Sequence, residues 1–428
     1  MKRLILKLPR LFLSKKLIKS GVLYTFGDFI GVAVSGFLLL PFYTRALTQT
    51  EFGIFSVVNS SLAILTFIVH FGIISTYSRL YFNQKDEYDK KVFTGQIVLL
   101  HFFMLSILFL LATIFESTIH KIFFTSINDN RYYFYLALVS AMSFLNALFG
   151  IYLRINEQAE RFLAFQLFAV ALYVAFIFIF KVWIENTLDA ILLASFISTF
   201  IMWIISIINL KFVLLFDNLF NVAKKVFHFA LPIFLGYIMY FLLNKFSILY
   251  LQYYENLENI ALFSFAMQLS TVLVIFAGSV GKAIQPILFK LEKNQIIEKT
   301  KKIAFYYKIV LSVAFGGFSL LSGLIISLFA PESYSGSRDV FLLLLLSVYI
   351  YNFRSVESLL FMYFHKPRYS LYIVSFGAMF VLILSFLLVP KYGYIGSAYA
   401  MLSGSVVAYF ASKIYNTKLL KMELKLKE

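Results

Sequence analysis

The chain consists of long apolar runs separated by short polar segments. Each run is long enough to cross a bilayer, which takes about 20 apolar residues. The runs lie at 20–44, 52–78, 92–114, 132–153, 162–180, 190–210, 226–252, 260–284, 303–329, 338–362, 370–389 and 393–412. Backbone polar groups inside hydrocarbon must bond to one another, so these runs are predicted to be helices. The pattern therefore predicts an all-α integral membrane protein with about twelve transmembrane helices.

The composition excludes a soluble globular protein. Of the 428 residues, 61% are hydrophobic and 14% are charged, whereas soluble domains carry about 25% charged residues. The net charge of +17 suggests a nucleic-acid partner, but the basic residues fall between the apolar runs, and we expect none. The chain has no cysteine, which excludes disulfides and thiolate metal sites.

The positions of the basic residues predict the orientation. With a cytoplasmic N-terminus, 28 of the 38 Lys and Arg residues lie on the cytoplasmic side, whereas acidic residues are nearly balanced at 10 inside and 9 outside. The six basic residues on the outer side are Arg45, Lys121, Arg131, Lys181, Arg338 and Lys391. Cytoplasmic loops carry the excess of Lys and Arg in membrane proteins. Both termini are therefore predicted to be cytoplasmic, and the first apolar run, too long for a signal peptide, is predicted to be retained.

The chain is predicted to fold as two halves. The predicted parts are a cytoplasmic N-terminal tail 1–19, an N-terminal six-helix bundle 20–210, a cytoplasmic linker 211–225, a C-terminal six-helix bundle 226–412 and a cytoplasmic C-terminal tail 413–428. The segment 40–56 is similar to the segment 248–264, about 207 residues later. Paired halves are common in transporters. A chance match between two apolar hairpins is the alternative.

Three stretches resemble the polysaccharide repeat-unit flippases of the multidrug/oligosaccharidyl-lipid/polysaccharide exporter superfamily. They are Leu40-Pro41-Phe42-Tyr43-Thr44-Arg45-Ala46-Leu47 with Glu51-Phe52-Gly53, then Phe71-Gly72-Ile73 with Arg79, and Val389-Pro390-Lys391-Tyr392-Gly393-Tyr394-Ile395-Gly396-Ser397-Ala398-Tyr399-Ala400. The resemblance implies two six-helix bundles around a central cavity. It also implies a substrate, an undecaprenyl-diphosphate-linked oligosaccharide, carried from the inner to the outer leaflet of the bacterial cytoplasmic (inner) membrane. The product would serve cell-surface polysaccharides such as O-antigen or capsule, and a polysaccharide polymerase is an expected partner beside the membrane lipids.

One position departs from these flippases. Relatives often carry an Asp-Arg pair late in the seventh span, where this chain has Ser247-Ile248. No ion or substrate role is carried over to that position.

Ionisable residues inside the spans are the candidate site residues, because such groups are costly in hydrocarbon and usually face a cavity or a partner. Asp28, within Gly27-Asp28-Phe29-Ile30-Gly31, is a candidate for coupling to H⁺ or Na⁺, since burial disfavours the charged carboxylate. The alternative is a carboxylate paired with a neighbouring helix. Glu357 is the second ion-coupling candidate.

Six basic residues are candidates for binding the substrate in the cavity. They are Arg354, Lys245, Lys282, Lys308, Arg45 and Arg79. Arg354 and Glu357, three residues apart, share a helical face; either they form an ion pair, or Arg354 is available for a phosphate, which its planar fork matches. Lys282 and Lys308 can instead extend to the interface, and Arg45 and Arg79 can be topology anchors.

No catalytic or cofactor-binding pattern is present. The segment Gly278-Ser279-Val280-Gly281-Lys282 lacks the first glycine and the final Ser or Thr of a phosphate loop, and the five histidines have no metal-ligand spacing. We expect no enzymatic activity, no cofactor and no metal. A cation-coupled drug or metabolite exporter is the main alternative, although four basic residues in spans against two acids favour an anionic substrate. A membrane polymerase or glycosyltransferase is the third hypothesis, and the short outer loops argue against it. The glycan, the coupling ion and the oligomeric state do not follow from the sequence.

Overall fold

The computed structural model describes residues 23–30, 34–127, 131–289 and 291–425, with the side chain of Lys282 outside that description. Within these ranges every regular element is a helix. Ten stretches of described residues are long and apolar enough to cross a membrane. The last of them, 368–423, merges two spans, because Gly393 interrupts it with a φ of 54°. The first predicted span, which includes α3, is not among the ten. The predicted all-α membrane fold with about twelve spans is confirmed.

The first half runs from the helix 23–30 to α10. Its elements are 23–30, η1 (Val34–Leu38), α3 (Leu40–Ala46), α4 (Gln49–His70), α5 (Ile73–Tyr81), α6 (Glu87–Ile114), α7 (Glu116–Phe123), α8 (Arg131–Ile155), α9 (Ala159–Trp183) and α10 (Thr187–Asn209). Side chains cap the N-termini of several of these helices. Thr48 and Glu51 form a capping box at α4, and Asp86 accepts a hydrogen bond from the backbone N–H of Asp89 at α6. Between α4 and α5 the chain turns through Phe71 and Gly72, both with positive φ.

The second half runs from α11 to α18. Its elements are α11 (Leu219–Asn244), α12 (Phe246–Leu251), α13 (Leu257–Phe289), α14 (Lys293–Leu320), α15 (Ser322–Phe329), η2 (Glu332–Ser337), α16 (Arg338–Asn352), α17 (Ser355–Tyr363) and α18 (Arg368–Lys425). Helix α6 begins at Glu87 and α14 at Lys293, 206 residues later. The starts of α7 and α15, at Glu116 and Ser322, have the same separation. This regular spacing supports the internal repeat expected from the sequence.

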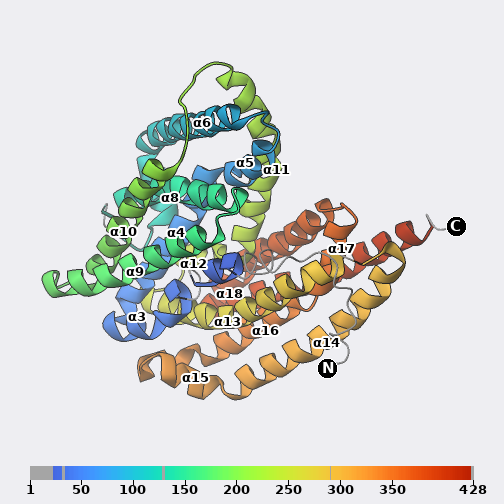
Figure 1. Ribbon diagram of the computed structural model, residues 1–428. Helices are drawn as coiled ribbons and strands as arrows, with labels where there is room; N and C mark the ends of the chain where they lie inside the picture. Colours follow the sequence, from blue (N-terminus) through green and yellow to red (C-terminus); the bar gives the residue numbers. More distant parts are fainter. Residues whose placement is uncertain (1–22, 31–33, 128–130, 290, 426–428) are drawn as a thin grey trace.

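The halves meet along α4 and α13, which pack against each other. A side-chain carbon at Gly53, near the start of α4, would lie 2.1 Å from the carbonyl oxygen of Leu257 at the start of α13. Only glycine allows so close an approach. The ribbons of the halves lie together around α3, α4, α12 and α13 and spread apart toward α6 on one side and α14 and α17 on the other (Figure 1).

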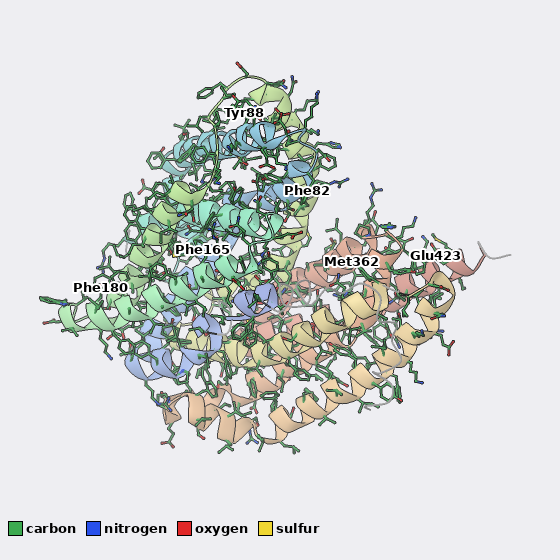
Figure 2. All side chains as sticks on the ribbon, in the orientation of Figure 1. Phe82, Tyr88, Phe165, Phe180, Met362 and Glu423 are labelled. Atoms are coloured by element: carbon green, nitrogen blue, oxygen red, sulfur yellow. The ribbon has the colours of Figure 1, made fainter. Side chains whose placement is uncertain are left out.

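Polar contacts join the halves at the ends that the basic residues assign to the outer side. The Thr44 hydroxyl donates to the Phe329 carbonyl at 2.6 Å, the Arg45 guanidinium to the Leu328 carbonyl at 2.8 Å, the Gln49 amide to the Ser333 carbonyl at 2.9 Å, and the Tyr253 hydroxyl to the Lys121 carbonyl at 3.0 Å. At the other end of the spans, exposed apolar side chains such as Phe82 and Met362 lie on separate halves (Figure 2). The structure is therefore closed on the predicted outer side.

The connection between the halves is held against α6. The Val213 N–H donates to the Lys91 carbonyl at 3.0 Å, and the Gln96 amide donates to the Asp217 carbonyl at 2.9 Å. A side-chain carbon at Gly95 would lie 2.0 Å from the Val213 carbonyl oxygen. Helix α11 then begins at Leu219, inside the segment 211–225 that was predicted as a linker.

Helix α11 contacts both halves. Past its midpoint, the rings of Phe234 and Phe71 stack at 4.4 Å between centroids, and the Tyr237 hydroxyl hydrogen-bonds Ser75 of α5 at 2.8 Å. The helix also packs along α18 of the second half. It contains Pro232 and ends at Asn244, so that only Lys245 separates it from α12.

Candidate functional site

A cavity of about 910 Å³ lies among α3, α4, α8, α9 and α10 and reaches the second half at Lys245, Gln268 and Thr271. Its polar lining consists mainly of amides, hydroxyls and two cations. These residues are Asn59, Asn146, Arg154, Gln166, Tyr173, Ser195, Ser198, Thr199, Lys245, Gln268 and Thr271. The described residues that line it include no Asp or Glu. A site of this kind suits a ligand that carries both negative charge and many hydroxyl groups.

Lys245 is one of the two cations that line the cavity. It lies at the break between α11 and α12, where its φ of −130° interrupts the helix. Its backbone N–H still donates to the Phe241 carbonyl at 2.7 Å. Discontinuous helices commonly form substrate sites in transporters, because the break exposes polar backbone and side-chain groups to the cavity. Among the predicted substrate-binding cations whose side chains the structure describes, Lys245 is the one that lines this cavity.

Arg154 is the second cation and was not among the predicted site residues. It lies at the C-terminal end of α8, forms an ion pair with Asp28 of the helix 23–30, and has its guanidinium carbon 4.3 Å from the centre of the Phe162 ring. Asp28 therefore has a partner on a neighbouring helix, which was the alternative to an isolated coupling site. A carboxylate inside a span needs a cation nearby. In the sequence, this requirement of Asp28 was the signal that could have indicated Arg154.

Aromatic rings form part of the cavity wall. Tyr43, Phe55, Phe162, Phe165 and Tyr173 line it. The hydroxyls of Tyr43 and Tyr173 are 2.8 Å apart and hydrogen-bonded, which ties α3 to α9. Flat aromatic faces beside amide and hydroxyl groups can contact the two faces and the edges of a sugar ring.

The charged residues of the second half form a separate cluster. Glu357 bonds to Lys308 of α14 at 2.6 Å, so the pair with Arg354 that their spacing suggested is not the one observed. Arg354 is buried, with its guanidinium carbon 4.3 Å from the centre of the Tyr351 ring. Its Nε makes no hydrogen bond within the described part of the chain. Arg354 and Lys308 are not among the residues that line the 910 Å³ cavity.

The remaining predicted cations lie elsewhere. Arg45 is exposed and bonds to carbonyl groups at the predicted outer end. Arg79 lies over the Phe229 ring at 4.5 Å, at the other end of the spans. Lys282 lies outside the residues whose side chains are described. The structure therefore brings together Arg154, Asp28 and Lys245, and leaves Arg45 and Arg79 at the two ends.

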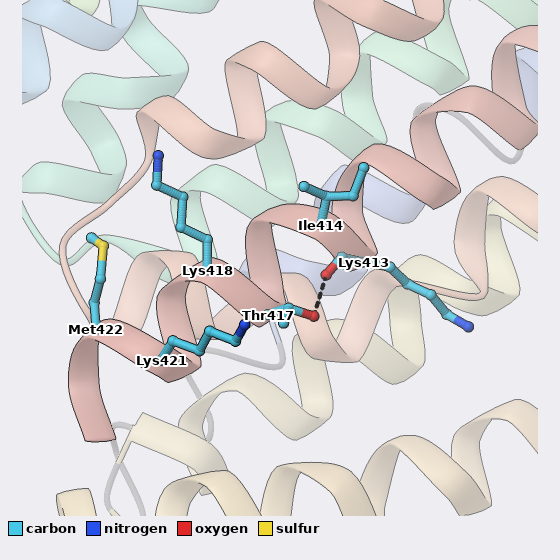
Figure 3. Close-up of a pocket in the computed structure, with 6 residues that line it drawn as sticks. All are labelled: Lys413, Ile414, Thr417, Lys418, Lys421 and Met422. Atoms are coloured by element: carbon cyan, nitrogen blue, oxygen red, sulfur yellow. Dashed lines mark hydrogen bonds between the residues drawn. The ribbon is translucent and has the colours of Figure 1, made fainter. Parts of the chain in front are cut away.

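A second hollow is a surface groove and not part of this site. It measures about 620 Å³ and is lined by Lys413, Ile414, Thr417, Lys418, Lys421 and Met422, all on the final turns of α18 (Figure 3). The dashed bond in that view joins the Thr417 hydroxyl to the Lys413 carbonyl within the same helix. Among the described residues, no group of three or more His, Cys, Asp or Glu side chains is placed to hold a metal ion.

Comparisons with known proteins agree with the fold. Residues 18–292 match the family described as "Polysaccharide biosynthesis protein". Among solved structures, the chain is similar to the lipid II flippase MurJ in an inward closed conformation, with a TM-score of 0.70 and 16% identity over 94% of this chain and 86% of that one. It is also similar to an inward-facing multidrug resistance transporter of the MATE family in the MOP superfamily, with a TM-score of 0.68 and 15% identity over 97% of each chain. A third match is a mutant of the Vibrio cholerae MATE transporter VcmN, with a TM-score of 0.61 and 14% identity over 95% of this chain and 97% of that one.

No curated protein matches the sequence. At 14 to 16% identity, the structural matches establish the fold alone. They share an all-α membrane architecture of two bundles, which agrees with the two halves seen here.

Proposed function

The chain belongs to the polysaccharide biosynthesis protein family, and from this premise we propose that it is a flippase for a lipid-linked oligosaccharide. The substrate is an undecaprenyl-diphosphate-linked repeat unit, carried from the inner to the outer leaflet of the bacterial cytoplasmic membrane. The proposal joins the family assignment to the resemblance noted in the sequence and to the fold shared with MurJ, which is itself a lipid II flippase.

The observation that carries the proposal is the cavity with two cations and no carboxylate among the described residues of its lining. A diphosphate cannot cross hydrocarbon bare, because an unpaired charge there costs many kcal/mol. Arg154 and Lys245 can supply charge-assisted hydrogen bonds to its oxygens. The amides and aromatic rings of the same wall suit the sugars. The lipid tail can stay in the bilayer, between helices.

Transport would proceed by alternating access. The ends of the halves that are predicted to face outward are joined through Thr44, Arg45 and Gln49, which supports a state loaded from the inner leaflet. Opening the outer side requires these contacts to break. The energy would come from an ion gradient, with Asp28 or Glu357 as the coupling carboxylate for H⁺ or Na⁺, or from consumption of the product by a polymerase.

The direct test uses the purified protein in liposomes that contain a fluorescent undecaprenyl-diphosphate oligosaccharide. A reductant that cannot cross the membrane quenches only the outer leaflet. We expect the protein to make the whole probe population accessible within minutes, whereas protein-free liposomes should leave about half protected. An unchanged protected fraction at full reconstitution would contradict the proposal.

A cation-coupled exporter of drugs or metabolites is the second candidate. It is favoured by the similarity to MATE transporters over nearly the full chain and by a carboxylate, Asp28, that contacts a cavity-lining residue. The same liposomes, loaded with a fluorescent organic cation and given a proton or sodium gradient, test it. Cation efflux without lipid translocation would select this function.

The proposed topology can be tested in the native membrane, because introduced cysteines are the only thiols in this cysteine-free chain. Lys85 and Ser335 are both exposed in the structure. In intact cells, an impermeant maleimide should label a Ser335→Cys variant and not a Lys85→Cys variant, because position 335 is predicted to be outside. Both variants should react after permeabilisation. Labelling of position 85 in intact cells would contradict the prediction that both termini are cytoplasmic.

Arg354 provides a test of the second-half cluster. If this cluster gives the diphosphate a further contact outside the 910 Å³ cavity, an Arg354→Ala variant should lose about tenfold in translocation, since a hydrogen bond to a charged group contributes about 1.5–3 kcal/mol. Arg354→Lys should recover only part, because the bidentate fork is lost. Glu357→Gln should have a smaller effect, since Glu357 bonds to Lys308. Rates are compared at equal amounts of monodisperse protein, and wild-type transport by Arg354→Ala would show that the second-half cluster does not contact the substrate.

A further inference from the structure

The ion pair between Arg154 and Asp28 borders the cavity. Arg154 is one of the lining residues. The two side chains are 33% and 35% exposed, so neither is sealed inside a helix interface. A ligand in the cavity can therefore reach the charged groups of this pair without unfolding either helix.

The pair uses only part of the hydrogen-bonding capacity of Arg154. One terminal nitrogen of the guanidinium donates to a single oxygen of Asp28. The Nε of Arg154 is buried and makes no hydrogen bond within the described part of the chain. A guanidinium has five N–H donors in a fork that matches phosphate oxygens. A diphosphate offers more oxygens and more negative charge than one carboxylate, so it can compete for this group.

The surroundings hold the guanidinium in place while its anion changes. The Phe162 ring lies beneath it at 4.3 Å, and the Tyr24 ring packs on the edge of Phe162 at 5.5 Å between centroids. A side-chain carbon at Gly27 would lie 2.8 Å from Phe162. The helix that carries Asp28 and the guanidinium of Arg154 therefore both pack against the Phe162 ring. Lys245 adds positive charge to the same cavity.

From this geometry we propose that Asp28 is a built-in counter-ion that the substrate diphosphate displaces from Arg154. The inference rests on the proposed flippase function and names the recognition step within it. Without Asp28, the empty cavity would hold an uncompensated cation, which is costly in a low-dielectric interior. Because Asp28 competes with the substrate for Arg154, it lowers the affinity and allows release on the outer side.

The test measures binding of undecaprenyl diphosphate, without sugar, to the purified full-length protein in nanodiscs. Asp28→Asn keeps the shape and removes the competing charge, so the affinity should rise about tenfold. Arg154→Ala should lower it by about the same factor or more. The double variant should bind as weakly as Arg154→Ala alone, because the gain depends on the arginine. Asp189→Asn, which removes the carboxylate of another arginine ion pair in the same half, should leave binding unchanged.

The chemistry of the ligand provides a second measurement. The gain in Asp28→Asn should be largest for the diphosphate, smaller for undecaprenyl monophosphate and absent for the neutral alcohol. Unchanged or weaker diphosphate binding in Asp28→Asn would overturn the inference, and so would a gain that persists in the Arg154→Ala background. If Arg154→Ala does not fold, Arg154→Lys replaces it, and the gain should then shrink.

Failure of this inference can be told apart from failure of the flippase function. Translocation of the saccharide by the wild-type protein, with no gain in Asp28→Asn, would reject the counter-ion and leave the flippase. Displacement of Asp28 by diphosphate in a protein that translocates no saccharide would reject the flippase and leave the exchange at Arg154.

Discussion

Translocation of the lipid-linked saccharide is expected to fall at least about a hundredfold in an Arg154→Ala/Lys245→Ala double variant. Both cations line the cavity, and each charge-assisted hydrogen bond contributes about 1.5–3 kcal/mol, while about 1.4 kcal/mol corresponds to a factor of ten. The loss should exceed that of either single variant. The measurement is the rate at which the fluorescent probe becomes accessible in liposomes.

A control variant separates the site from net charge. Lys121→Ala/Lys181→Ala removes two exposed basic residues on the predicted outer side, outside the cavity lining, and should transport normally. Near-wild-type transport by the Arg154/Lys245 variant, at equal amounts of folded protein, would show that the substrate is not held by this cavity.

Joining the outer ends of the two halves is expected to stop transport almost completely. Gln49 of the first half donates to the Ser333 carbonyl of the second at 2.9 Å, so a Gln49→Cys/Ser333→Cys pair can be bridged by a short, cleavable thiol cross-linker. If this side must open to release the substrate, the bridge should trap the inward-loaded state. Cleaving the linker should restore the initial rate.

The matched control is a bridge within one half. Arg131 of α8 and Asp189 of α10 form an ion pair at 3.0 Å in the first half. A cross-linked Arg131→Cys/Asp189→Cys variant should keep transporting, because the two helices would move together as parts of one half. Full activity of the bridged Gln49/Ser333 variant would exclude opening between these residues.

The fold could be predicted because a backbone inside hydrocarbon must hydrogen-bond to itself. Apolar runs of sufficient length must become helices, and wherever the structure describes the predicted runs they coincide with helical elements. The repeat was visible only around residues 40–56 and 248–264, where α3–α4 and α12–α13 now lie. These segments include the place where the starts of α4 and α13 meet at Gly53, and such a contact between helices limits substitution more than exposure to lipid does.

The site was less predictable because the contacts between helices do not follow from the spacing within them. Arg154 lies just past the apolar run 132–153 and was counted with the cytoplasmic basic residues, yet the cavity extends to it. Arg354 caps the start of α17, and the Ser358 N–H donates to its carbonyl at 3.0 Å, so the helical spacing from Arg354 to Glu357 is kept, but spacing within one helix does not show which side chains approach from other helices. Glu357 reaches Lys308 on a different helix.

Helix α11 is attached to both halves, which must move relative to each other during alternating access. The segment before it is held to α6, the helix contacts the first half as far along as Tyr237, and it also packs along α18 in the second half. If the halves rock, α11 must bend. Pro232 removes one backbone hydrogen bond from the helix, and the break at Asn244–Lys245 removes its continuity with α12. The two halves would then move as rigid bodies connected by a flexible helix. The stiffness of α11 would set the rate at which the empty transporter returns to its inward-open state.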